Sequence, residues 1–256
     1  MYIDTHTHLY DETLITDEQQ IQRAIEAGVT RMYMPNCDSG TIKGMLQLAD
    51  QWPENCLPMM GLHPTYVKEN YNDELAIVEK WLGDRQFYAV GEIGLDYYWD
   101  MTFKEQQIIA FERQIDLALQ HNLPIVIHSR SSTQDCIDIV RKKQNGKLTG
   151  VFHCFSGTTD EAKQIMELGF YLGLGGAFTY KKSTLPDTLK EIGLSHVVLE
   201  TDAPYLAPVP YRGKRNESSY IPVIAVKIAE LMEVSYLDVE RITTENAEVL
   251  FKSQVN

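Results

Sequence analysis

Short apolar runs alternate with longer amphipathic stretches along most of this chain. The apolar runs are rich in β-branched and aromatic residues, a composition typical of strands. The stretches between them carry apolar residues three or four positions apart, which predicts helices. Eight runs are predicted as strands, at residues 2–5, 29–34, 57–62, 87–93, 124–128, 150–153, 170–174 and 197–201.

Three of the intervening stretches begin with a pattern that predicts the start of a helix. A threonine is followed three residues later by Glu or Gln, as in a capping box. Glycines then predict where two of these helices end. The pairs are Thr16 with Gln19, Thr102 with Glu105 and Thr158 with Glu161, and the terminating residues are Gly28 and Gly169.

Strands that alternate with helices predict a parallel sheet of the α/β class. Eight such units in 256 residues predict closure into a single (β/α)₈ TIM barrel. An open doubly wound sheet is the alternative, and it would usually carry a glycine-rich turn after an early strand, where Thr5-His6-Thr7-His8 stands instead. Two further helices are expected to cover the barrel from residue 219 onward. We therefore expect residues 1–256 to form one domain.

Composition indicates a globular cytoplasmic protein with no membrane segment. Hydrophobic residues make up 44% and charged residues 23%, and no run approaches the roughly 20 apolar residues of a membrane span. The first residues lack a basic stretch followed by an apolar one, so no secretory signal is expected. Cys37, Cys56, Cys136 and Cys154 form no C-x-x-C pair, which favours reduced thiols.

The formal net charge of −13 limits the kind of partner this chain can bind. An acidic surface repels a polyanion at long range, which argues against a broad basic footprint on duplex DNA. A cleft that takes a few nucleotides remains compatible with this charge, because bound cations can supply local positive charge.

Histidine, Asp or Glu stands at the end of five predicted strands. The carboxyl ends of the strands are where barrel enzymes place their active sites. A single His in such a place is usually structural and a single Asp is often a helix cap, but five such ends indicate one shared site. The residues are His6 and His8, then Glu92, His128, His153 and Asp202.

Four imidazoles and two carboxylates exceed what one catalytic zinc requires, since such an ion takes three protein ligands. Two cations sharing a bridging carboxylate fit this number better. Glu92 is the expected bridge, because strand four lies across the barrel from strands one and eight. One metal with additional histidines around it is the alternative.

Six short motifs stand in order along the chain, and most of them contain a candidate ligand. They are Asp4-Thr5-His6-Thr7-His8, Gly61-Leu62-His63-Pro64, Gly91-Glu92-Ile93-Gly94-Leu95-Asp96-Tyr97, Ile127-His128-Ser129-Arg130, His153-Cys154-Phe155-Ser156-Gly157 and Glu200-Thr201-Asp202-Ala203-Pro204-Tyr205-Leu206. Their order and spacing resemble the TatD family of metal-dependent deoxyribonucleases, within the amidohydrolase superfamily of barrels. This resemblance implies His6, His8, Glu92 and Asp202 around one ion, and Glu92, His128 and His153 around the other.

Other residues are candidates for substrate contact. The resemblance implies that His63 contacts the reacting phosphate, and a structural hydrogen bond is its alternative role. Arg212, Lys214 and Arg215 form one compact basic cluster that is expected to bind phosphate or to be a solvated loop. Glu200 is expected behind the metal ligands. Tyr97, Tyr98 and Trp99 are expected either to stack on a base or to pack at the root of a loop.

These features predict hydrolysis of a DNA phosphodiester, at strand ends or in short oligonucleotides, with no obligate protein partner. Paired cations lower the pKa of a water molecule, Asp202 accepts or orients its proton, and Glu92 holds the cations. The cations are expected to be Zn²⁺, Mn²⁺ or Mg²⁺. The alternative substrates are a small ester, lactone or amide, or the ester bond of D-aminoacyl-tRNA. A non-enzymatic binding protein is disfavoured because no ligand is missing.

Overall fold

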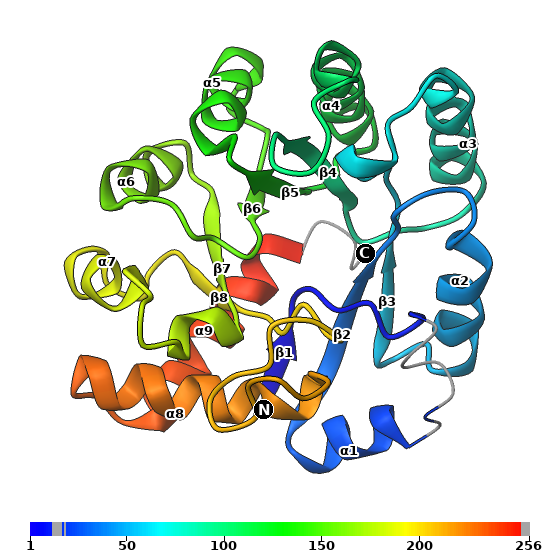
Figure 1. Ribbon diagram of the computed structural model, residues 1–256. Helices are drawn as coiled ribbons and strands as arrows, with labels where there is room; N and C mark the ends of the chain where they lie inside the picture. Colours follow the sequence, from blue (N-terminus) through cyan, green and yellow to red (C-terminus); the bar gives the residue numbers. More distant parts are fainter. Residues whose placement is uncertain (12–16, 18, 252–256) are drawn as a thin grey trace.

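Eight parallel strands form the centre of the computed structural model, which describes residues 1–11, 17 and 19–251 (Figure 1). They belong to two sheets, one with the order β1-β2-β3 and one with the order β4-β5-β6-β7-β8. The strands are β1 (Tyr2–Asp4), β2 (Val29–Pro35), β3 (Cys56–Met59), β4 (Val90–Asp96), β5 (Ile125–Arg130), β6 (Gly150–Phe152), β7 (Tyr171–Leu174) and β8 (Val197–Leu199).

Backbone hydrogen bonds join the two sheets at both seams. Between β1 and β8, the Thr5 amide donates to the Leu199 carbonyl at 3.0 Å. Between β3 and β4, the Gly91 amide donates to the Met60 carbonyl at 3.1 Å. The ring of strands is therefore closed, which confirms the predicted α/β barrel and shows that the open-sheet alternative is wrong.

Helices surround this ring, and the chain alternates strand and helix from β1 to β8 (Figure 1). In the described part of the chain, none of the helices is both long and apolar enough to cross a bilayer. The helices are α1 (Gln20–Glu26), α2 (Ile42–Gln51), α3 (Tyr71–Asp84), α4 (Lys104–His121), α5 (Thr133–Lys143), α6 (Thr159–Glu167), α7 (Leu185–Ile192), α8 (Ile221–Met232) and α9 (Tyr236–Phe251).

The predicted capping boxes have different outcomes. The Thr158 side chain accepts a hydrogen bond from the Glu161 amide, and the Glu161 carboxylate accepts one from the Thr158 amide, so this box is confirmed. Thr102 does not cap α4, which begins at Lys104 after an N-cap residue with no capping hydrogen bond, so that prediction is wrong. The box at Thr16 lies outside the described residues. Gly28 and Gly169 follow their helices with φ of 86° and 78°, as expected of terminating glycines.

The last helix closes the floor of the barrel. Its Phe251 ring stacks on Tyr33 of β2 with the ring centroids 3.8 Å apart. Asn246 donates hydrogen bonds to the carbonyls of Leu194 and Val197, at the amino end of β8. Buried side chains of α9 join those that point into the barrel from most strands, in a cluster formed by Ile3, Tyr33, Leu57, Met59, Ala89, Val126, Val151, Val198, Ala247, Leu250 and Phe251. The opposite end of the barrel, where the strands have their carboxyl ends, is not covered by α9 and is where barrel enzymes place their active sites.

Candidate metal centre

His6 and His8 lie just beyond the end of β1 rather than within the strand. Their backbone continues alongside the loop after β8, because the Asp202 amide donates to the His6 carbonyl at 2.9 Å. The His8 amide in turn donates to the Ala203 carbonyl at 2.8 Å. This pairing brings the first two histidines next to Asp202, although 194 or more positions separate them in sequence.

Glu92 lies inside β4, not at its end as predicted. β4 continues to Asp96 because Gly94, Leu95 and Asp96 pair with β5. His128 likewise lies within β5, two residues before its end. The predicted strands end too early, at residues 93 and 128. The apolar runs stop there, whereas the backbone hydrogen bonds between β4 and β5 continue to Asp96 and Arg130.

The glycines on either side of Glu92 allow close packing of β4 on β5, rather than making room around the carboxylate. A Cβ on Gly91 would lie 2.6 Å from the Val126 Cβ. A Cβ on Gly94, whose φ is 137°, would lie 2.1 Å from the His128 carbonyl oxygen. The glycines thus fix the separation between the strands that carry Glu92 and His128.

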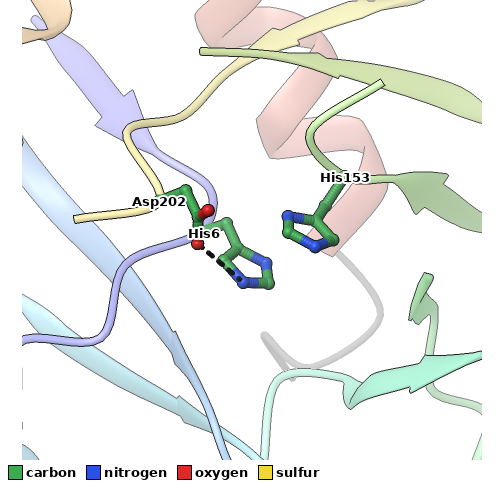
Figure 2. Close-up of side chains that lie close together, drawn as sticks. All are labelled: His6, His153 and Asp202. Carbon is green, nitrogen blue, oxygen red and sulfur yellow. Dashed lines mark ion pairs between the residues drawn. The ribbon is translucent and has the colours of Figure 1, made fainter. Parts of the chain in front are cut away.

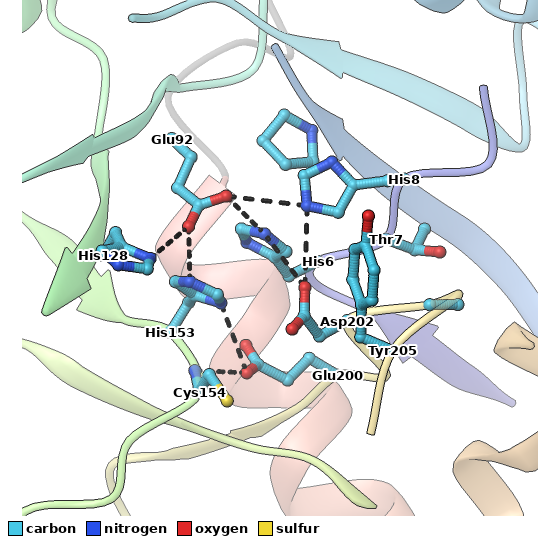
Figure 3. A network of polar contacts seen from close by, with 12 residues as sticks. His6, Thr7, His8, Glu92, His128, His153, Cys154, Glu200, Asp202 and Tyr205 are labelled. Carbon is cyan, nitrogen blue, oxygen red and sulfur yellow. Dashed lines mark hydrogen bonds and ion pairs between the residues drawn. The ribbon is translucent and has the colours of Figure 1, made fainter. Parts of the chain in front are cut away.

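One oxygen of Glu92 faces the histidines that follow β1 (Figure 3). Its Oε2 lies 3.1 Å from His6 Nε2 and 3.6 Å from His8 Nε2. Asp202 completes this group, with its Oδ1 3.6 Å from His8 Nε2 and 3.9 Å from His6 Nε2. These are the four residues assigned above to the first ion.

The other oxygen of Glu92 faces the histidines of the following strands. Its Oε1 lies 2.8 Å from His128 Nδ1, 2.7 Å from His153 Nε2 and 3.2 Å from His63 Nε2. His153 also stacks on His6, with parallel rings and centroids 3.8 Å apart (Figure 2), so it contacts a histidine of the first group as well as Glu92 Oε1. The predicted ligands therefore meet around a single carboxylate.

Burial alone would raise the pKa of Glu92, because its carboxylate is removed from water. The surrounding histidines, chiefly His153, His63 and His6, outweigh this effect and hold the pKa well below its usual value. Glu92 is consequently a buried anion surrounded by imidazole nitrogens.

Hydrogen bonds fix which nitrogen of two histidines faces the site. The Tyr10 hydroxyl donates to the Pro35 carbonyl, so its oxygen accepts from His8 Nδ1 at 3.1 Å. His128 Nε2 donates to Asp96 Oδ2 at 2.8 Å. In both rings the outer nitrogen thus carries a proton. The inner nitrogens face Glu92, with His128 Nδ1 2.8 Å from Glu92 Oε1. They would give up their own protons to bind a cation, and this leaves the tautomer that a metal ligand requires.

His63 has the opposite arrangement. Its Nδ1 accepts a hydrogen bond from the Thr65 amide at 3.1 Å, so in a neutral imidazole the proton lies on Nε2. Burial lowers the pKa of His63, in agreement with a neutral ring. The nitrogen that faces Glu92 is thus a donor and has no lone pair for a metal. The geometry disfavours a ligand role for His63, and its contact with the reacting phosphate stays a prediction.

The donors at Glu92 suit divalent cations. Metal–ligand bonds of about 2.0–2.2 Å place two ligands of one ion roughly 3.0–3.5 Å apart. The separations of His6 Nε2 and His8 Nε2 from Glu92 Oε2 and from Asp202 Oδ1 are 3.1–3.9 Å, close to this range. Imidazole and carboxylate together are ligands for Zn²⁺, Mn²⁺ or Fe²⁺. The residues therefore fit Zn²⁺ and Mn²⁺ among the cations that the sequence predicts, whereas Mg²⁺ prefers more oxygen ligands than this set of residues offers.

Three buried residues that support the site have no assigned role in the sequence interpretation. Asp96 orients His128, and Tyr10 orients His8. Asp4 accepts hydrogen bonds from the backbone and side chain of Thr201, at 2.9 and 2.6 Å, which ties β1 to the loop carrying Asp202. A polar residue at the end of an apolar strand was the available signal for Asp4 and Asp96, whereas nothing in the pattern pointed to Tyr10.

Glu200 lies behind the predicted metal ligand His153. It accepts a hydrogen bond from the Cys154 amide, and its Oε1 lies 3.7 Å from His153 Nδ1. A Cβ on Gly173 would lie 2.2 Å from Glu200 Oε2, so glycine there leaves space for this carboxylate. Glu200 thus limits the position of His153 from the side away from Glu92.

The three aromatic residues after β4 divide into two roles. Tyr97 packs at the root of the loop, where its hydroxyl donates to Asp135. Tyr98 and Trp99 are 58% and 68% exposed, and the Arg130 guanidinium lies over both rings. Their backbone amides donate to Asp96 Oδ1, at 2.9 and 3.0 Å. The backbone of these two exposed residues is therefore held by Asp96, the same carboxylate that orients His128.

The predicted basic cluster is not one surface. Arg212 stacks on the Tyr180 ring, with its guanidinium 4.4 Å from the ring centroid. Arg215 bonds instead to Asp17 at 2.7 Å. The exposed Lys214 lies between them in sequence, and its amide donates to the Tyr211 carbonyl. The side chains of Arg212 and Arg215 thus contact different parts of the molecule.

Together, the closed barrel and the histidine–carboxylate centre at its carboxyl end define a metal-dependent hydrolase. Residues 3–252 match the family described as TatD related DNase, and the chain belongs to this TatD family. YabD of Bacillus subtilis, described as an uncharacterised metal-dependent hydrolase, is 38% identical over 254 residues, covering 98% of this chain and 99% of the relative.

Solved structures agree with this assignment. The crystal structure of YjjV, a TatD homologue from Escherichia coli, matches with a TM-score of 0.92 and 28% identity over 98% of each chain. A mutant of a lactonase from Deinococcus radiodurans matches with a TM-score of 0.68 and 10% identity, over 98% of this chain and 95% of that one. The latter likeness concerns the fold alone.

Proposed function

We propose that this protein hydrolyses phosphodiester bonds of DNA, at strand ends or in short oligonucleotides, with two divalent cations. The observation that carries the proposal is the position of the Glu92 carboxylate between two groups of donors. One of its oxygens faces each group. A carboxylate shared in this way is typical of sites with two metals. The family's description as a DNase supports the choice of substrate.

In this proposal His6, His8 and Asp202, together with Glu92, would hold one cation. His128 and His153, together with Glu92, would hold the other. When bound, two such cations lower the pKa of water and neutralise charge on a phosphate. A protein of net charge −13 can therefore accept a phosphodiester at this centre.

The chain's own residues move the proton and bind the phosphate. Asp202 Oδ1 is the oxygen nearest His6 and His8, which leaves Oδ2 to accept a proton from the attacking water. A bond forms between the water oxygen and phosphorus, and the bond from phosphorus to the sugar oxygen breaks. The proton returns from Asp202 to that sugar oxygen. His63 Nε2–H donates to a non-bridging oxygen as negative charge grows there.

Substrate approaches from the exposed side of the centre. The side chains of Asp202 and His128 are each 16% exposed and that of His63 is 13% exposed, whereas that of His6 is fully buried. Solvent can therefore reach Asp202, the proposed proton acceptor, and His63, the proposed hydrogen-bond donor to the phosphate. Tyr98 and Trp99, whose backbone amides are held by Asp96, have exposed rings on which bases can stack.

A cleavage assay tests this function. Purified protein loaded with Mn²⁺, Mg²⁺ or Zn²⁺ is expected to shorten linear single-stranded DNA labelled at either end and to leave circular single strands intact. Replacing Glu92 by Gln removes the shared charge and is expected to abolish cleavage. Glu54→Gln is the matched control, because Glu54 is exposed before β3, at the other end of the barrel.

The same preparations are tested on a lactone and on D-aminoacyl-tRNA. Turnover of either one without cleavage of DNA would contradict the proposal and support the corresponding alternative. Metal analysis of the loaded protein is expected to give two ions per chain. One ion per chain, with full activity, would show that the single-metal alternative is correct.

A further inference from the structure

A cleft of about 620 Å³ opens between the loops that follow β6, β7 and β8. Ser156 reaches it three residues after His153, and Arg212 ten residues after Asp202. The cleft is therefore built from loops that leave the same strand ends as the metal centre. Its remaining lining comes from the loop after β7 and the first residue of α7, namely Ala177, Tyr180, Lys181, Lys182, Ser183, Thr184 and Leu185.

Positive charge is concentrated in this cleft. Lys181, Lys182 and Arg212 line it, and no Asp or Glu does. All three cations are exposed, and within residues 1–11, 17 and 19–251 none of them forms an ion pair. Three unneutralised cations repel one another, and in a chain with 36 acidic and 23 basic residues their proximity is not a property of the surface as a whole.

The cleft also holds one of these cations in a defined position. The Arg212 guanidinium lies over the Tyr180 ring, 4.4 Å from its centroid. Tyr180 is itself fixed, because its hydroxyl donates to the Ala207 carbonyl at 3.0 Å. The hydroxyls of Ser156, Ser183 and Thr184 add hydrogen-bond donors, and the amino end of α7 adds a partial positive charge.

We propose that this cleft binds the phosphodiester backbone of the substrate strand, at phosphates beyond the bond that is cleaved. Guanidinium, ammonium and hydroxyl groups are the side chains that contact nucleic-acid phosphates. The lining carries no carboxylate or side-chain amide, and contacts that its cations make with phosphates are independent of base sequence. This inference rests on the proposed function for its substrate, and it replaces the predicted cluster with Arg212, Lys181 and Lys182.

Binding experiments test the cleft without requiring cleavage. The affinity of a fluorescein-labelled single-stranded oligothymidylate is measured by anisotropy in EDTA over a series of salt concentrations. The variants are the double substitution Lys181→Ala with Lys182→Ala, and Arg212→Ala. Lys190→Ala is the matched control, because this lysine is exposed near the other end of α7 and lies outside the cleft.

Each phosphate contact to a single strand contributes about 0.7 to the slope of log affinity against log salt. We expect the slope to fall by about 1.4 in the double variant and about 0.7 in Arg212→Ala, with affinity at least about tenfold weaker in the double variant at low salt. With Mn²⁺, KM for a hexanucleotide should rise while that for a dinucleotide stays unchanged. Lys190→Ala should match the wild type throughout.

The outcomes separate this inference from the proposed function. If the wild type does not bind the oligonucleotide, or if the cleft variants keep its affinity and salt slope, the inference is wrong, whether or not DNA is cleaved. If the cleft variants lose affinity as expected but the wild type cleaves no DNA, the phosphate cleft stands and the proposed reaction does not.

Discussion

The second nitrogen of each histidine determines what its first nitrogen can do in this centre. In His8 and His128 the outer nitrogen donates, to Tyr10 and to Asp96, which leaves the inner nitrogen, facing Glu92, as the one that can bind a cation in place of a proton. In His63 the outer nitrogen accepts from the Thr65 amide, which leaves an N–H in the same direction. One residue type thus supplies both metal ligands and a hydrogen-bond donor within a few ångströms.

This difference predicts that His63→Ala separates metal binding from catalysis. Removing a single hydrogen-bond donor to a developing oxyanion typically lowers kcat by about 10²–10³-fold. We expect a loss of that size with the metal content unchanged, measured by elemental analysis and by cleavage kinetics on the same preparation. His196→Ala, which removes an imidazole just before β8, should leave both quantities as they are. A parallel fall in metal content would instead identify His63 as a ligand.

At this scale the sequence was sufficient for the residues that meet at Glu92 but not for those that orient them. His6, His8, Glu92, His128, His153 and Asp202 could be predicted because the strand ends of a barrel converge. The partners Tyr10 and Asp96 act through the direction of one hydrogen bond, which depends on side-chain geometry and leaves no mark in hydrophobic periodicity. The same limit applies to Arg212, whose neighbours in space come from another loop.

Among the elements, β4 shows how strand packing sets the position of a ligand. Gly94 has a φ of 137°, and a Cβ there would lie 2.1 Å from the His128 carbonyl oxygen. Both the backbone conformation and the available space therefore require glycine. Gly83 in α3 is the opposite case, since an added Cβ would meet nothing within 4 Å.

The two glycines form a matched pair for a stability measurement. Gly94→Ala is expected to reduce the free energy of unfolding by about 3 kcal/mol or more, from strain and overpacking combined. Gly83→Ala is expected to raise it by about 0.5–1 kcal/mol, because alanine restricts the unfolded chain and favours a helix. Chemical denaturation monitored by circular dichroism measures both. Equal effects of the two substitutions would contradict this account of β4.

Element types were predictable from periodicity, while their limits were not. Thr158 caps α6 through a reciprocal bond with Glu161, whereas the same spacing at Thr102 lies two residues before α4 begins. There the Thr102 amide donates to Asp100, so a local turn takes the place of the capping box. A capping pattern identifies a turn that could start a helix, but competing side chains decide which residue does.

For the whole molecule, the metal centre acts as a link between distant parts of the barrel. Its proposed ligands come from β1, β4, β5, β6 and β8 or from the loops directly after them. Cations that bind the folded chain and not the unfolded one stabilise it by mass action, by about 2.7 kcal/mol per site at a concentration one hundred times Kd.

We therefore expect metal-stripped protein to unfold at a lower temperature than protein loaded with Mn²⁺ or Zn²⁺. For a chain of this size each kcal/mol corresponds to about 2–4 °C in Tm. Differential scanning calorimetry after EDTA treatment and after reloading measures the shift. Glu92→Gln should lose most of it, and Glu54→Gln none. If the protein binds metal but its Tm is the same with and without it, the proposed ligand set is wrong.

The barrel itself could be predicted from alternation, count and the missing glycine-rich turn. Its closure depends on seams such as that between Met60 and Gly91, where a few backbone hydrogen bonds join two sheets. One partner in each of these bonds, Met60 or Thr5, lies just beyond the end of its strand, and such bonds have no sequence pattern of their own. The interior position of α9 was equally hidden, because its apolar residues resemble those of any amphipathic helix.

The floor that α9 provides has a consequence for synthesis. Tyr236–Phe251 follow every strand in the chain, so they leave the ribosome after all eight strands have emerged. Until then the inward-facing side chains at that end, Tyr33 among them, have no Phe251 to cover them. The nascent barrel therefore exposes an apolar surface at this end, to which a chaperone can bind. This surface is covered only after Phe251 has left the ribosome.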